Sequence, residues 1–258
     1  MTKIYKKSEI TFAIFWIVLY TVSMGLLRNL GDDSPFMMVG LVVISGLMLL
    51  FVWKNRLMEK YGLSGWAKNS QAMLWFLPLW FITTLNLWGG ITPRYSMPGQ
   101  LFVIVSMAFV GFAEELIFRG FLFKAMLKDG NVITAVIVSS VTFGLGHILN
   151  LFTGHELAET LMQVVFAVSY GFLVTMTFYK GGSLIPCILS HSLFDIFAQF
   201  ASDDASPLLN WIGHGVMIIL TALYCLYLAK RVETPLVNRI SRQKAKNEVD
   251  TNKRSTHG

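Results

Sequence analysis

Three charged side chains lie within six consecutive positions of an otherwise apolar run, and they constrain the fold more than any other feature. Glu114, Glu115 and Arg119 occur in residues 109–121, where every other residue is apolar or glycine. A charged group at the centre of a membrane helix costs about 2.5–3.5 kcal/mol, so it requires a partner or a function. On a helix Glu115 and Arg119 are four residues apart and can pair, whereas Glu114 projects from a neighbouring face. The pattern predicts one ion pair and one carboxylate, Glu114, without a helical partner.

The composition identifies the surrounding chain as a membrane protein. Of 258 residues, 54% are hydrophobic and 14% are charged, which is too apolar for an ordinary soluble domain. At about 20 residues per crossing, the apolar runs predict eight transmembrane helices, the first a retained span and not a cleaved signal peptide. Their expected ranges are 10–27, 36–53, 72–88, 101–123, 132–152, 161–179, 184–200 and 208–229.

The distribution of Lys and Arg predicts the orientation of these helices. If the N-terminus is cytoplasmic, 18 of the 21 basic residues lie in inner segments, Arg28 and Arg94 lie outside, and Arg119 is intramembrane. This asymmetry predicts that both termini are cytoplasmic and that the loop around His155 is external. We expect one transmembrane domain over residues 1–229, with a catalytic core at about 101–200, followed by a basic disordered tail at 230–258 near anionic lipid.

Two further helices carry intramembrane polar residues at a spacing of four. Phe143 and His147 share one face of the fifth predicted helix, and His191 and Asp195 share one face of the seventh. At about 1.5 Å per residue, Glu114 and His147 lie at similar depth on adjacent helices. His191 matches that depth only if its helix starts deeper in the membrane or is strongly tilted, as Gly181, Gly182 and Pro186 indicate.

Together these groups suit hydrolysis of a peptide bond. Glu114, Asp195 and two imidazoles in one cavity can hold a divalent metal ion or share protons around an activated water, and both alternatives remain open. The His-Glu-x-x-His signature of common zinc peptidases is absent from the sequence. Cys187 and Cys225 lie in apolar runs without ligand spacing and are interpreted as small buried hydrophobes.

The three motifs Glu-Glu-x-x-x-Arg, Phe-x-x-x-His and His-x-x-x-Asp, in this order over residues 109–200, resemble those of the CPBP family. This family of intramembrane endopeptidases includes the type II CAAX prenyl proteases and the Abi proteins of bacteriocin processing and self-immunity. The resemblance implies that Glu114 activates water and that Glu115 and Arg119 support it. It implies His147 as a second activating group, and His191 with Asp195 as oxyanion stabilisers. If a metal such as Zn is bound, Glu114, His147 and His191 are its expected ligands. The eukaryotic CAAX enzymes tend to have Asn where this chain has Asp195, and an ionised Asp cannot donate a hydrogen bond.

We therefore predict an all-α, polytopic membrane protein with a conical or bundle-like intramembrane cavity, located in a bacterial plasma membrane. Its predicted function is cleavage of a membrane-anchored or hydrophobic peptide near the cytosolic half of the bilayer. The expected partners are membrane lipid and that peptide substrate, and no nucleic acid, because the net charge of +6 lies mostly in loops and the tail. The alternatives are a proton- or ion-coupled transporter and a non-catalytic immunity protein.

Overall fold

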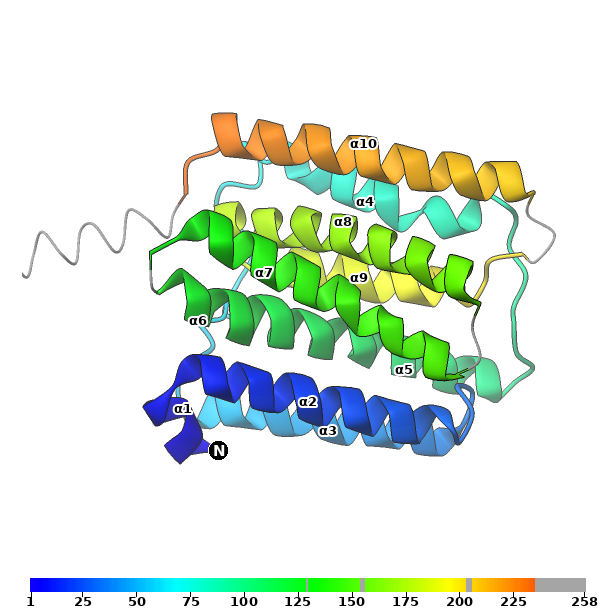
Figure 1. Cartoon of the computed structure of the whole chain (residues 1–258), viewed down its shortest axis with the longest axis horizontal. Helices are drawn as coiled ribbons and strands as arrows, with labels where there is room; N and C mark the ends of the chain where they lie inside the picture. The colour runs from blue at the N-terminus through cyan, green and yellow to red at the C-terminus, as the bar shows by residue number, and fades with distance from the viewer. Residues whose placement is uncertain (129, 154–155, 203–205, 235–258) are drawn as a thin grey trace, which may run out of the picture.

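The computed structural model is a bundle of helices that run side by side along one long axis (Figure 1). It describes residues 1–128, 130–153, 156–202 and 206–234, and this part of the chain contains helices and no named β-strand. In chain order the helices are α1 (Thr2–Lys7), α2 (Glu9–Arg28), α3 (Pro35–Lys54), η1 (Leu74–Phe76), α4 (Leu77–Thr83), η2 (Leu85–Leu87), α5 (Gly99–Glu115), the π-helical η3 (Leu116–Phe123), α6 (Lys124–Leu127), α7 (Val132–Leu145), η4 (Gly146–Thr153), α8 (Leu157–Gly181), α9 (Ile185–Ala198) and α10 (Pro207–Arg231).

The all-α membrane architecture is confirmed, whereas the count of eight spans is not. Each predicted apolar run is helical, but only six helices in the described residues are long and apolar enough to cross a bilayer. The other two apolar helices, at Leu74–Leu87 and Ile185–Ala198, have 14 residues each. A 14-residue helix is about 21 Å long, which is shorter than the roughly 30 Å hydrocarbon core of a bilayer.

Backbone geometry explains why the third predicted helix is short. Leu74, Trp75 and Phe76 have φ values of 53°, 51° and 60°, which belong to the left-handed region. L-residues rarely adopt this region, and it cannot continue a right-handed α-helix. The apolar pattern of residues 72–88 therefore gives α4 only after this left-handed turn, with Pro78 in its first turn.

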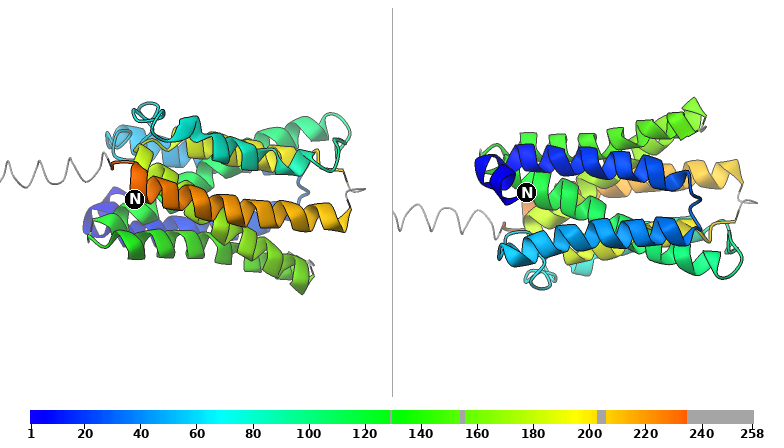
Figure 2. Two further views of the ribbon diagram at one scale, coloured as in Figure 1. Left: turned by 90° about the horizontal axis from the view of Figure 1, so that it is seen from above. Right: turned by 90° about the horizontal axis from the view of Figure 1, so that it is seen from below.

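The N-terminus and the end of α10 lie at the same end of the bundle (Figures 1 and 2). The predicted loop residue His155 and most of the predicted tail, residues 235–258, lie outside the described residues. We call the end that holds the N-terminus, α6 and the end of α10 the basic end, because Lys3, Lys6, Lys7, Lys128 and Lys230 lie there. The other end, where α2 ends and α5 begins, is called the far end.

The interior near the basic end is filled by aromatic side chains. Phe12 of α2 contacts Phe51 of α3 and Phe121 of η3, with ring centroids 4.6 and 5.0 Å apart. Tyr61 packs edge-on against Phe121 at 5.1 Å, and each of these rings is at least 94% buried. All eight residues of η3 are buried as well. This packing ties α2, α3 and the segment that follows α3 to the helix that carries the charged motif.

The turn between α8 and α9 is buried inside the protein, which confirms that α9 begins below the bundle surface. Gly182 ends α8 with a φ of 70°, and its N–H donates to Phe178 O at 2.8 Å. Residues 55–73 cover this turn: Leu184 N–H donates to Gly62 O at 2.9 Å, and Ser183 Oγ donates to Gly65 O at 2.7 Å. Backbone outside a helix is tolerated at membrane depth where protein satisfies its polar groups. The deep start raises His191 to the level of Glu115.

Helix α9 packs directly on α5 because Gly111 has no side chain. A Cβ atom at Gly111 would lie 2.6 Å from both the backbone N and the Oγ of Ser192. Ser192 Oγ also donates to Ala108 O at 2.9 Å, which holds the two helices in register. This close approach sets the distance between the carboxylates of α5 and the imidazole of α9.

We expect Gly111→Ala to destabilise the protein by about 1–3 kcal/mol, because the added methyl group must push α9 away from α5. Thermal unfolding of the purified protein in detergent measures this loss. The matched control is Gly46→Ala in α3, where nothing lies within 4 Å of an added Cβ. That control should retain or slightly increase stability, since alanine is the better helix former. Equal stability of the two variants would contradict the proposed helix contact.

Candidate active site

Glu115 is a fully buried carboxylate that joins two helices. Its Oε1 accepts a hydrogen bond from Arg119 Nη1 at 3.1 Å and another from His191 Nδ1 at 2.9 Å. Arg119 and Glu115 side chains are both 0% exposed. The predicted ion pair is therefore confirmed. It also has a third member, His191, which the spacing on one helix could not reveal.

Arg119 is held by contacts from three directions. Its Nε donates to Thr175 Oγ1 of α8 at 3.3 Å, and its guanidinium carbon lies 4.3 Å from the ring centre of Phe143 in α7. A guanidinium over an aromatic face is stabilised by the ring quadrupole, especially where water is excluded. The π-helical turn η3 carries Arg119 and follows directly after Glu115. Such turns are rare in proteins and occur frequently at functional sites.

Glu114 faces a different set of partners. Its Oε1 accepts a hydrogen bond from the hydroxyl of Tyr20 in α2 at 3.1 Å, and its Oε2 lies 3.7 Å from His191 Nε2. The side chain is 16% exposed, whereas that of Glu115 is 0% exposed. Glu114 has no partner on its own helix, as predicted, but it is the more accessible of the two carboxylates and has a donor from α2.

His191 lies among three carboxylates. Because an ionised carboxylate can only accept, the Nδ1–H donates to Glu115, and Nε2 is directed toward Glu114 and Asp195. Asp195 Oδ2 lies 3.5 Å from that Nε2, one helical turn further along α9. Asp195 is thus close enough to orient the imidazole, as its spacing predicts.

His147 is at the edge of this cluster. Its Nδ1 lies 3.4 Å from the carbonyl oxygen of Phe143, which can only accept, so Nδ1 carries the proton in this contact. The neutral ring then has its lone pair on Nε2. Within the described residues His147 forms no ion pair with Glu114, and the ring of Phe143 packs edge-on against both His147 and His191.

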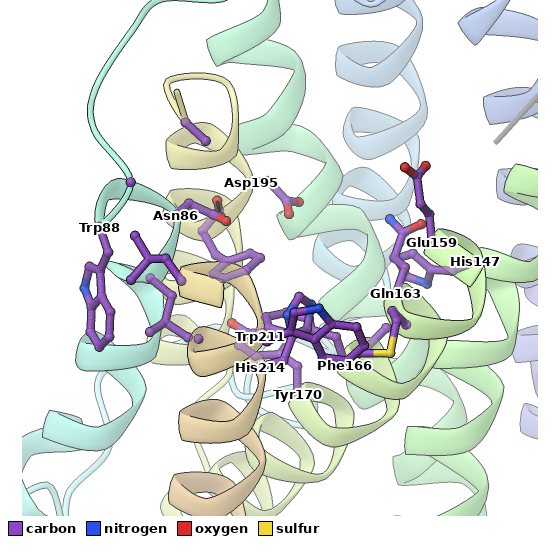
Figure 3. A pocket seen from close by; sticks show the side chains of 18 of the residues that line it. Asn86, Trp88, His147, Glu159, Gln163, Phe166, Tyr170, Asp195, Trp211 and His214 are labelled. Atoms are coloured by element: carbon purple, nitrogen blue, oxygen red, sulfur yellow. Dashed lines mark hydrogen bonds between the residues drawn. The ribbon is translucent and has the colours of Figure 1, made fainter. Parts of the chain in front are cut away.

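Two cavities meet at His147. The first, of about 720 Å³, is lined by His191, Asp195 and the aromatic side chains of Phe166 and Tyr170 (Figure 3). The second, of about 430 Å³, is lined by Glu114, Tyr20, Phe143 and Arg28. His147 lines both cavities, and Glu114 of one lies only 3.7 Å from His191 of the other. The polar cluster therefore occupies the junction between the two cavities.

The expected metal ligands are not gathered in this arrangement. Among the described residues, no group of three or more His, Cys, Asp or Glu side chains has a geometry that could hold a metal ion. Glu114 and His191 approach each other, but His147 is directed to the Phe143 carbonyl. The donor set Glu114, His147 and His191 does not fit a bound metal as it stands.

Comparison with known proteins agrees with the motifs. Residues 97–197 match the family model described as type II CAAX prenyl endopeptidase, Rce1-like. The match supports the resemblance of this segment to the CPBP family. All six predicted site residues fall within it, and the matched description is that of the type II CAAX prenyl endopeptidases. No curated protein and no solved structure matches the chain.

Sequence reasoning missed Tyr20, Thr175, Tyr170 and Ser190. Tyr20 and Thr175 bond directly to the charged residues, and Ser190 accepts or donates bonds to Thr83 and Tyr170 behind His191. Each is a single hydroxyl in an apolar helix, where such residues commonly act as interhelical contacts. The only sequence signal for Tyr20 is its depth in the membrane, since it lies about 17 Å along α2 from Glu9.

Replacing Arg119 should reduce stability strongly. Arg119→Ala removes a cation from a fully buried carboxylate, and breaking a buried ion pair in this way costs about 3–5 kcal/mol. Arg119→Lys should recover only part of this loss, because an ammonium cannot bond Glu115 and Thr175 with a planar fork. Folded yield and thermal unfolding in detergent measure both variants. Lys54→Ala, at an exposed lysine, is the control and should stay within about 0.5 kcal/mol of the parent. Normal yield and stability of Arg119→Ala would refute the pairing.

Proposed function

We propose that this protein is a CPBP-type intramembrane endopeptidase that cleaves a hydrophobic or membrane-anchored peptide with a water activated by Glu114. The observation that carries the proposal is the convergence of Glu114, Glu115 and His191 at the junction of two cavities. The match of this segment to an endopeptidase family supports the same reaction.

Glu114 has the position expected of a general base. Its carboxylate lines a cavity and remains partly exposed, so a water molecule can reach it. The carboxylate takes a proton from that water as the water oxygen attacks the peptide carbonyl carbon. The protonated Glu114 then gives the proton to the leaving nitrogen as the C–N bond breaks, leaving a carboxylic acid and an amine.

His191 is suited to stabilise the charge that develops on the carbonyl oxygen. His191 is fixed by the bond from its Nδ1–H to Glu115, and as an imidazolium facing Glu114 and Asp195 it also directs an Nε2–H into the junction. A donor that is already oriented stabilises an oxyanion without paying for reorganisation during the reaction. His147 lies across the junction, where the lone pair on its Nε2 can accept a hydrogen bond from the attacking water. In this scheme Asp195 orients His191 and does not itself donate a hydrogen bond. An Asp can therefore take the place of the Asn that the eukaryotic CAAX enzymes tend to have.

The proposed reaction uses a water activated by Glu114 alone, because the described Glu114, His147 and His191 side chains are not grouped as the ligands of one ion. Glu115, Arg119 and Thr175 serve as positioning residues that keep His191 and Glu114 in place. Addition of a chelator should therefore leave the cleavage rate unchanged. Loss of cleavage that is restored by Zn²⁺ would instead assign Glu114, His147 and His191 as ligands that gather around the metal.

Substitution of Glu114 tests the catalytic assignment. Glu114→Gln keeps the shape of the side chain and an oxygen that accepts the Tyr20 bond, so folded yield should be retained. Turnover should fall by about 10²- to 10⁴-fold, the usual contribution of a positioned acid–base group. The measurement is cleavage of a peptide library by the purified protein in detergent, followed by mass spectrometry.

Several outcomes separate the proposal from other functions. His191→Ala should also abolish most activity, and combining it with Glu114→Gln should add little, since groups acting as one unit are not additive. A transporter would cut no peptide, and Glu114→Gln would instead change the pH dependence of uptake. An immunity protein would keep full protection with Glu114→Gln. Cleavage by Glu114→Gln at the rate of the unmodified protein would contradict the assignment of Glu114 as the general base.

Tyr20 supplies a second test, because it positions Glu114 from outside the matched segment. Tyr20→Phe removes only the hydroxyl, and a hydrogen bond to a charged group is worth about 1.5–3 kcal/mol. We expect kcat to fall about tenfold or more with KM nearly unchanged. The matched control is Tyr224→Phe, which removes another buried hydroxyl, bonded to Met73 O at 2.6 Å, far along the chain from the site. If both variants lose kcat equally, Tyr20 has only a structural role.

A further inference from the structure

Both cavities lie toward the far end of the bundle. The larger one is lined by the end of η2 and the following loop, the first half of α8, the last half of α9 and the first turns of α10. The smaller one is lined by the last turns of α2 and by η4. All these segments lie at or near the end where α2 ends (Figures 1 and 2). Exposed residues such as Arg94, Glu159 and Arg28 are among the lining, so the spaces reach the surface there.

The path from the polar cluster to the basic end is filled with protein. Below Glu114, Phe121 of the buried segment η3 packs against Phe12 and Tyr61, and Phe12 packs in turn against Phe51. Residues 55–73 then cover the α8–α9 turn, and their packing is tight. A Cβ atom at Gly62 would lie 2.8 Å from Gly182 O. A peptide cannot reach Glu114 through this region without displacing the core.

The distribution of charged residues indicates which end of the bundle faces which side of the membrane. Of the 15 Lys and Arg residues in the described part of the chain, 12 lie at or near the basic end, whereas Arg28 and Arg94 lie at the far end. Acidic residues Asp32, Asp33 and Glu159 are also at the far end. Segments rich in Lys and Arg remain on the cytoplasmic side during insertion. The far end is then the outer one.

From these observations, and resting on the proposed function, we infer that the site takes its substrate from the outer side of the membrane. The substrate class is a translocated peptide, or the outer flank of a membrane-anchored protein. This differs from the expectation of cleavage near the cytosolic half of the bilayer. The reaction that supplies the substrate must therefore be a membrane translocation or insertion step that precedes cleavage.

The depth of the site adds a requirement on the conformation of the substrate. Glu114 lies 15 residues from the start of α5 at Gly99, which corresponds to about 22 Å of helix. An extended chain advances about 3.3 Å per residue, so about seven residues must be unfolded to reach from the outer end to Glu114. A folded domain cannot enter, and a flexible outer segment can.

The experiment compares two single-span reporter proteins that carry the same cleavable sequence, identified first from the peptide library in detergent. One reporter carries it on the outer flank of its span and the other on the cytoplasmic flank. Each is co-expressed with the protein, with Glu114→Gln as the inactive control. We expect the outer-flank reporter to be cut at least tenfold more than its counterpart. If the unfolded spacer of the outer-flank reporter is shortened from ten to three residues, cleavage of that reporter should fall by a similar factor.

Thiol labelling establishes the orientation in the same cells. In a background where Cys187 and Cys225 are replaced by Ala, Glu159→Cys should react with an impermeant maleimide in intact cells, and Lys54→Cys should react only in inverted vesicles. Equal or preferred cleavage of the cytoplasmic-flank reporter, or labelling of Lys54→Cys in intact cells, would overturn the inference. Absence of cleavage both in detergent and in cells would instead reject the proposed peptidase function.

Discussion

The buried carboxylate of Glu115 is the interaction on which the rest of the site depends. An isolated ionised carboxylate in a low-dielectric interior is costly, and its attraction to one cation offsets this only with good geometry. Oε1 of Glu115 accepts hydrogen bonds from Arg119 on its own helix and from His191 on α9, whereas Oε2 is buried without a partner among the described residues. These bonds require α5 and α9 to approach closely, which explains a glycine at position 111. They also hold His191 so that its second nitrogen faces Glu114.

The two glutamates are adjacent in sequence but have different environments. Glu115 is completely enclosed and its bonds go to fixed side chains, so it is suited to hold the structure together. Glu114 is one residue earlier, turned by about 100° around the helix, and lies against a cavity. Adjacent positions on a helix thus give one structural and one accessible carboxylate. A pair spaced by three or four residues would place both on the same face.

The sequence predicted the parts of this arrangement that depend on local periodicity. The membrane class, the Glu115–Arg119 pair and the deep start of α9 follow from hydropathy, the spacing of four, and the glycines and proline at 181–186. The sequence could not predict the short α4, because nothing in an apolar run indicates three consecutive left-handed residues. It also could not predict Tyr20, since its bond to Glu114 joins residues 94 positions apart and depends on how α2 packs. The direction of His147 could not be predicted either, because it depends on the backbone of α7 and η4.

The position of Tyr20 also bears on where the functional unit begins. The matched segment supplies both carboxylates, both imidazoles and Arg119, and its helices pack on one another. However, one wall of the smaller cavity and the hydrogen bond to Glu114 come from α2. Helix α2 is fixed in turn by the aromatic packing of Phe12 on Phe51 and Phe121 near the basic end. The same packing therefore closes the basic end and sets the position of Tyr20 at the cavity. An alteration of the N-terminal helices is then expected to change the geometry around Glu114 even though no matched residue is touched.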